Sequence, residues 1–127
     1  MNRKDIERRL AEYIEALKSM ETDQWVGQYS ETATVEDPVS GPVHTGPDQL
    51  RAFFEGVRKN FRLLQIKPEM TVILPPEAAV KAEVFGITKT GVELTFDLIA
   101  TYKFAEDGKV QQMRAFWDPV ALAKKLK

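Results

Sequence analysis

The sequence contains no cysteine and only one histidine, His44, among its 127 residues. Without cysteine there is no disulfide, no thiol nucleophile and no cysteine-ligated metal, and a single histidine excludes a multi-histidine metal centre. An all-oxygen site for a hard cation stays compatible with this composition. His44 lies in a loop rich in proline and glycine, where an isolated histidine indicates no particular chemistry.

Long apolar runs and a charge excess of either sign are missing as well. No segment approaches the roughly 20 apolar residues that cross a bilayer, and charged residues stand near the start, where a signal peptide has its apolar segment. The net charge of −1 gives no reason to expect nucleic acid or a membrane as a partner. With 43% apolar and 29% charged residues, the composition predicts one soluble domain over residues 1–127, located by default in the cytoplasm.

The first half of the chain carries the apolar periodicity of helices, and the second half alternates as strands do. Helices followed by an antiparallel sheet predict an α+β fold, in which the sheet curls around the helices as a cone with a pocket inside. The predicted helices cover residues 3–20, 22–29 (with Thr22 and Asp23 as caps), 47–57 and 121–126. The predicted strands cover residues 33–37, 62–73, 79–89, 92–104 and 109–118, with a loop at 38–46 and turns at 75–76, 90–91 and 106–108.

Asp37 is the leading candidate for a catalytic group, because it ends a short apolar strand directly before Pro38. Proline biases the residue before it toward an extended conformation, which aims Asp37 at a cavity from a strand end. Beside an apolar pocket a carboxylate is partly desolvated, so its pKa rises and it becomes a stronger general base. The alternative is that Asp37 only caps the loop that follows. Its neighbour Glu36 alternates to the opposite face and is predicted to be a surface charge.

Tyr13 lies within the apolar stripe of the first helix. A tyrosine there is usually a core residue with a satisfied hydroxyl, and the functional alternative is a donor to a substrate oxygen that becomes negative. In the strand at 92–104, alternation turns Leu98, Ala100 and Tyr102 inward and Asp97 outward. The side chains predicted to line the pocket, each of which is also typical of ordinary core, are Tyr29, Phe53, Phe54, Leu98, Ala100, Met113 and Trp117.

Taken together, these residues resemble the bacterial ketosteroid isomerase family, part of the nuclear transport factor 2-like (NTF2-like, SnoaL-like) group. The resemblance implies an NTF2-like cone around three N-terminal helices and an enzyme that moves a C=C bond into conjugation with a ketone. Asp37 would carry the proton and Tyr13 would hydrogen-bond the dienolate oxygen, without a metal or organic cofactor. The segments that carry the resemblance are 11–17, 29–38, 46–54 and 108–117.

The resemblance also implies partners. It predicts a small apolar ketone such as a steroid as the substrate, and a homodimer formed through the outer face of the sheet, where Ile99 and Phe116 give modest support. Two alternatives remain open. One is a binding protein for small apolar ligands without catalysis, and the other is a SnoaL-like cyclase or hydrolase.

One part of the isomerase pattern is missing, because Ala100 stands where the family has an aspartic acid as second donor to the oxyanion. Losing one such donor typically costs about 10²–10³ in rate. Glu83 is the candidate replacement, since a count about Thr90-Gly91 places it roughly opposite Leu98. The alternative is a register one residue different, which turns Glu83 to solvent.

Overall fold

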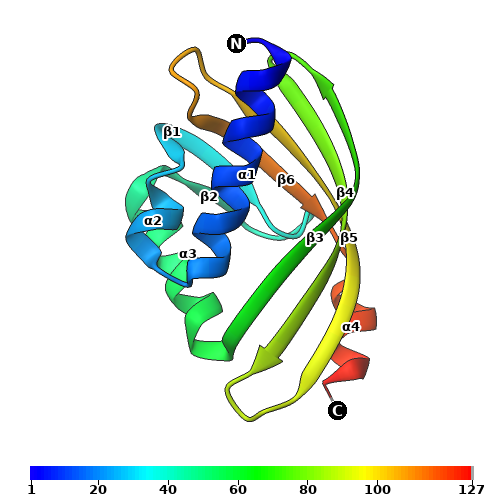
Figure 1. Ribbon diagram of the computed structural model, residues 1–127. Helices are drawn as coiled ribbons and strands as arrows, with labels where there is room; N and C mark the ends of the chain where they lie inside the picture. The colour runs from blue at the N-terminus through cyan, green and yellow to red at the C-terminus, as the bar shows by residue number, and fades with distance from the viewer. Residues whose placement is uncertain (127) are drawn as a thin grey trace.

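The computed structural model of the protein describes residues 1–126. Its six strands form one curved sheet, and helices α1, α2 and α3 pack on the concave side, which confirms the predicted α+β cone (Figure 1). None of the helices among these residues is long and apolar enough to cross a membrane. In chain order the elements are α1 (Arg3–Ser19), α2 (Thr22–Val26), β1 (Tyr29–Glu36), β2 (Val43–Thr45), α3 (Gly46–Asn60), β3 (Phe61–Leu74), β4 (Glu77–Thr88), β5 (Glu93–Phe104), β6 (Val110–Phe116) and α4 (Pro119–Lys125).

Local sequence accounts for where the helices begin and end. Helix α1 starts at a capping box, in which Asn2 and Asp5 each accept a hydrogen bond from the other's backbone N–H. It ends at Met20, which has a left-handed backbone with φ of 59°. Proline in the first turn of both α3 and α4 fits its fixed φ, so α4 begins at Pro119 rather than at residue 121.

The second helix is shorter than the sequence predicted, because α2 ends at Val26 and Gly27 follows it. Tyr29 is therefore not helical and is the first residue of β1. The predicted cap is also wrong: Thr22 is inside the helix, and its hydroxyl donates to Glu55 instead.

The sheet runs in the order β2-β1-β6-β5-β4-β3, and it is mixed rather than wholly antiparallel, since β1 pairs with β6 in parallel. The extra strand β2 lies in the segment predicted to be a loop. His44 sits in β2 opposite Val35 of β1. The end of β1 is thus held on both sides, by β2 and by β6, and this fixes where the next residue, Asp37, is placed.

The pairing of β4 with β5 is centred on Thr90, so the hairpin loop inside the Thr88–Val92 hydrogen bond has three residues, 89–91, and not the two that the sequence count assumed. The N–H of Thr88 donates to the carbonyl of Val92 at 2.9 Å, and Gly91 takes the positive φ of 92° that such a loop needs. As a result Glu83 pairs with Asp97 on the outer face, where both are exposed. A shift of one residue in a strand moves every side chain to the other face, so of the two predicted alternatives the one that turns Glu83 to solvent is observed, and Glu83 does not line the pocket.

Candidate active site

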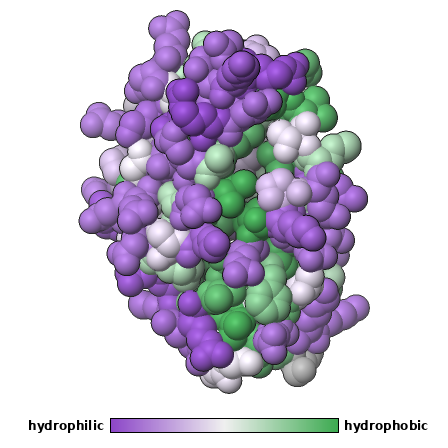
Figure 2. Space-filling model, in the orientation of Figure 1, coloured by the Kyte–Doolittle hydropathy of each residue, from purple (hydrophilic) through white to green (hydrophobic). Residues whose placement is uncertain are grey.

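A cavity of about 420 Å³ lies between the helices and the concave face of the sheet. Figure 2 shows apolar side chains gathered in a strip along the middle of the molecule, with polar residues on either side. Figure 1 shows α1, α2 and α3 to one side of the middle and β3 to β5 to the other. Six residues predicted to line the pocket do so: Phe53, Phe54, Leu98, Ala100, Met113 and Trp117.

Asp37 and Tyr13 both line this cavity, although they are 24 positions apart in the sequence. Asp37 follows β1 directly, and the N–H of Val39 donates to the carbonyl of Ala115 at 2.8 Å, which holds the segment after it. Among the described residues, no backbone N–H of the following loop donates to the Asp37 carboxylate. The alternative in which Asp37 caps that loop is therefore wrong.

The Asp37 carboxylate receives one hydrogen bond, from the indole Nε1 of Trp117 to Oδ1 at 2.5 Å. The side chain is only partly accessible, because it borders the cavity while protein surrounds it on the other sides. Burial raises the pKa of Asp37 from its ordinary value to about 6, and the hydrogen bond from Trp117 opposes that rise. A carboxyl group with such a pKa exchanges its proton near neutral pH.

The hydroxyl of Tyr13 belongs to a hydrogen-bonded cluster of aromatic side chains. Its oxygen lies 2.6 Å from the hydroxyl oxygen of Tyr29, and the indole N–H of Trp25 donates to it at 3.3 Å. When Tyr29 donates to Tyr13, the Tyr13 proton is free to point into the cavity. Burial raises the pKa of Tyr13, so this hydroxyl stays neutral and remains a donor.

Tyr29 itself is not part of the cavity wall, which corrects its predicted place. Its side chain lies behind Tyr13, with the two rings edge to face at 5.8 Å. The prediction placed Tyr29 in a helix, whereas it is the first residue of β1. Its hydroxyl is hydrogen-bonded to the Tyr13 hydroxyl.

Two further cavity residues, Trp25 and Tyr102, were not assigned to the site from the sequence. Trp25 stacks on Phe54 with the ring centroids 4.9 Å apart, and its indole N–H donates to Tyr13. No local sequence pattern predicts these contacts. Tyr102 was expected to face inward from the alternation of β5, and that orientation was the signal available. Its ring meets the Tyr13 ring edge to face at 5.1 Å.

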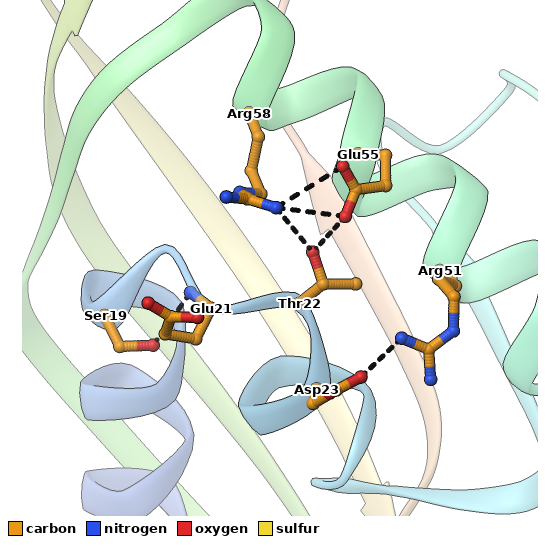
Figure 3. A network of polar contacts seen from close by, with 7 residues as sticks. All are labelled: Ser19, Glu21, Thr22, Asp23, Arg51, Glu55 and Arg58. Atoms are coloured by element: carbon orange, nitrogen blue, oxygen red, sulfur yellow. Dashed lines mark hydrogen bonds and ion pairs between the residues drawn. The ribbon is translucent and has the colours of Figure 1, made fainter.

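A network of polar contacts fastens α2, which carries Trp25, to α3 (Figure 3). The hydroxyl of Thr22 donates to Glu55 at 2.5 Å, and Arg58 contacts the same carboxylate at 3.1 Å. Arg51 pairs with Asp23 at 2.5 Å one turn along. These contacts hold the two helices whose aromatic side chains form one wall of the cavity.

The remaining polarity of the cavity is low. Asp37 is the only carboxylate among the lining residues that the structure describes, and lysine, arginine and histidine are absent from that same set. The polar groups available are thus one carboxyl group of raised pKa, the tyrosine hydroxyls, the tryptophan indoles and the exposed amide of Asn60, and the rest of the lining is apolar. That set suits the removal of a proton next to a carbonyl better than the hydration of a polar substrate.

Two solved structures are similar to this chain over nearly its whole length. One is SalBIII, described as an epoxide hydrolase/cyclase-like enzyme with a role in pyran ring formation in polyether salinomycin; it is 22% identical, with a TM-score of 0.83 over 94% of this chain and 95% of that one. The other is a putative polyketide cyclase from Xanthomonas campestris, 14% identical, with a TM-score of 0.89 over 100% of both chains. At these identities the similarity establishes the fold, which is the NTF2-like cone.

The family is identified from the sequence. The model of the SnoaL-like domain family matches residues 10–113, which include the second part of α1, Asp37 and most of the sheet. The segment contains Tyr13, Asp37 and Tyr102 and most of the other residues that line the cavity, whereas Ala115, Trp117 and Leu122 lie beyond it. The chain is a member of the SnoaL-like domain family.

Proposed function

We propose that the protein is an isomerase that moves a carbon–carbon double bond into conjugation with a ketone in a small apolar molecule. The observation that carries the proposal is a single carboxyl group of pKa about 6 that shares an apolar cavity with a neutral tyrosine hydroxyl. The same pair was expected from the resemblance to ketosteroid isomerases. Steroids are the substrate class that this apolar, aromatic-walled cavity favours.

The proposed reaction is a proton transfer within one molecule. Asp37, as the carboxylate, takes a proton from the carbon between the ketone and the isolated double bond. The electron pair moves toward the ketone oxygen, which becomes a dienolate oxygen held by the Tyr13 hydroxyl. Asp37 then returns the proton to the far carbon of the conjugated system, so the double bond shifts and the base is regenerated.

The pKa of Asp37 suits both halves of this cycle. A carboxyl of ordinary pKa is a weaker base, and one of much higher pKa would hold the proton at neutral pH and leave no base. At about 6, Asp37 is mostly ionised at pH 7 and still accepts a proton more readily than an exposed aspartate. The low polarity of the cavity also strengthens the hydrogen bond from Tyr13 to a developing negative charge.

The test is a continuous ultraviolet assay of conjugated enone formation from a 3-oxo-Δ5 steroid. We expect turnover by the unaltered chain and a loss of about 10²–10⁴ in kcat for Asp37→Asn, the range of a general base. Glu36→Gln is the matched control, because this neighbouring carboxylate pairs with Arg114 and lies outside the cavity lining. Turnover that persists in Asp37→Asn, or no turnover with any such ketone, contradicts the proposal.

A second candidate is a cyclase, favoured by the two similar structures described as cyclase or cyclase-like. In that reaction Asp37 takes a proton next to one carbonyl, and the enolate carbon attacks a second carbonyl of the same molecule. A C–C bond forms, and the new alkoxide takes the proton back from Asp37. A flexible diketone separates the candidates: formation of an isomeric ring product, with no steroid turnover, favours the cyclase.

A further inference from the structure

Tyr102 has a hydroxyl for which the fold provides no partner. The residue is 94% buried by surface (6% exposed), yet its side chain lines the cavity. Every fully enclosed side-chain nitrogen or oxygen of the described residues has a hydrogen-bond partner. No residue that the structure describes hydrogen-bonds the Tyr102 hydroxyl, so this oxygen must open into the cavity.

The neighbours of Tyr102 in the sheet give its hydroxyl nothing to bind. In the register it stands beside Ala78 of β4 and Met113 of β6, both apolar. Polar groups that the protein encloses are nearly always paired, and the Tyr102 hydroxyl can find its partner only in the cavity into which it opens. An unpaired hydroxyl that faces a ligand cavity is most simply explained by a ligand atom that completes it.

The side chain also lies directly against that of Tyr13 in the cavity wall. The two rings meet edge to face with centroids 5.1 Å apart. Burial raises the pKa of Tyr102, and the nearby Tyr13 and Asp37 raise it further, so the hydroxyl stays protonated and can only serve an anion as a donor.

Tyr102 is next to the position that lacks the expected donor. Ala100 precedes it by two residues on the same inward face of β5, about 6.6 Å along the strand. The small Ala100 side chain leaves space on that face, and the longer tyrosine occupies the next inward position. A donor missing at one place on β5 is thus available from the adjacent one.

We propose that Tyr102 is a second hydrogen-bond donor, which donates to the same ligand oxygen as Tyr13. The inference rests on the proposed function, because a second donor of this kind matters when the oxygen becomes negative. It adds a residue to that function, since it explains how the chain stabilises an enolate without a carboxylic acid on β5. The ligand class follows as well: a flat apolar molecule with one ketone or enolate oxygen at its end.

The experiment measures binding and needs no turnover. The probe is 2-naphthol, a planar fused-ring phenol whose ionised form resembles a dienolate and is distinguished from the neutral form by absorbance. Affinities are measured in the Asp37→Asn background, which removes the negative charge that would repel the anion. Naphthalene, which lacks the oxygen, reports any change in apolar packing. The Asp37→Asn protein is compared with the double variant that carries both Asp37→Asn and Tyr102→Phe.

We expect Tyr102→Phe to weaken naphtholate binding about 10- to 100-fold, the range for one hydrogen bond to a charged group, and to leave naphthalene binding unchanged. Thr101→Val is the matched control, because it removes a hydroxyl from the adjacent residue, which is not part of the cavity wall. It should leave both affinities unchanged. An unchanged ratio of naphtholate to naphthalene affinity in Tyr102→Phe overturns the proposal.

A second measurement covers a Tyr102→Phe variant that fails to fold. The parent protein labelled at tyrosine Cζ with ¹³C contains three tyrosines, and each signal is followed as naphtholate is added. We expect the Tyr13 and Tyr102 signals to move, and movement of Tyr13 without Tyr102 overturns the proposal. The two proposals can fail separately. If isomerisation depends on Asp37 but is unchanged in Tyr102→Phe, only the proposal of a second donor is wrong. If naphtholate binding depends on Tyr102 but the protein catalyses no isomerisation, only the proposed function is wrong.

Discussion

Replacing Asp37 by asparagine should make the folded protein more stable while it removes the base. In the unfolded chain Asp37 has its ordinary pKa of 3.8, and in the folded protein the pKa is about 6. Asparagine has nearly the same shape, and its Oδ1 can accept the same hydrogen bond from Trp117. The substitution therefore removes the cost of a buried charge with little change in packing.

The size and sign of the effect follow from the two pKa values. Between about pH 4 and pH 6 the folded protein binds more protons than the unfolded chain, so its free energy of unfolding falls as the pH rises. The rise from 3.8 to about 6 is about two pKa units, and each is worth about 1.36 kcal/mol, which sets a ceiling of about 3 kcal/mol. Because Asp37 keeps some accessible surface, we expect a gain of about 1–3 kcal/mol above pH 6 for Asp37→Asn.

The assay is urea unfolding of both proteins between about pH 4 and pH 8, followed by tryptophan fluorescence. The gain should be close to zero at the acid end, grow through the interval and level off above about pH 6. Asp97→Asn is the control, since it makes the same substitution at an exposed carboxylate on the outer face, where no buried charge is removed. A variant that is less stable than the parent at pH 8 refutes the reasoning, because it would mean that the fold stabilises the Asp37 anion.

Three further predictions concern the groups around Asp37 and Tyr13. Tyr13→Phe should lower kcat for a 3-oxo-Δ5 steroid by about 10²–10³ with little change in KM. A rise in KM with kcat unchanged would contradict the role of Tyr13 as an oxyanion donor. Trp117→Phe keeps the aromatic wall and removes the N–H that lowers the pKa of Asp37, so the acid limb of the rate profile should move to higher pH; an unmoved limb would refute this. Thr22→Val should lower the free energy of unfolding, measured by urea unfolding, by about 1 kcal/mol, because the hydrogen bond to Glu55 is lost. An unchanged free energy of unfolding would show that the contacts in Figure 3 do not stabilise the fold.

Most of the fold was predictable because helical and alternating periodicities are local properties of the sequence. The long strands β3 to β6 and the turns at 75–76 and 106–108 appear where expected. The errors arose where a few residues decide between alternatives. A three-residue loop instead of a two-residue turn moved Glu83 to the outer face, and Gly27 ended α2 before Tyr29. The parallel pairing of β1 with β6 depends on contacts distant in sequence, which no local pattern encodes.

The candidate site was predictable in its centre and less so in its surroundings. Asp37 was identified from its place before Pro38 and Tyr13 from its place on the helix stripe, and both line the same cavity. The hydrogen bonds that hold them come from Trp117, Trp25 and Tyr29. Those partners lie 80, 12 and 16 positions away, so only the folded chain reveals which group each one contacts.

The pH dependence of kcat/KM tests most directly whether Asp37 is the base. The account predicts that isomerisation of a 3-oxo-Δ5 steroid falls on the acid side with a single ionisation near pH 6 and is pH-independent above it, because the carboxylate is the active form. The same limb should be absent from the residual activity of Asp37→Asn. A rate that stays constant down to about pH 4, or an acid limb that survives in Asp37→Asn, would contradict the account.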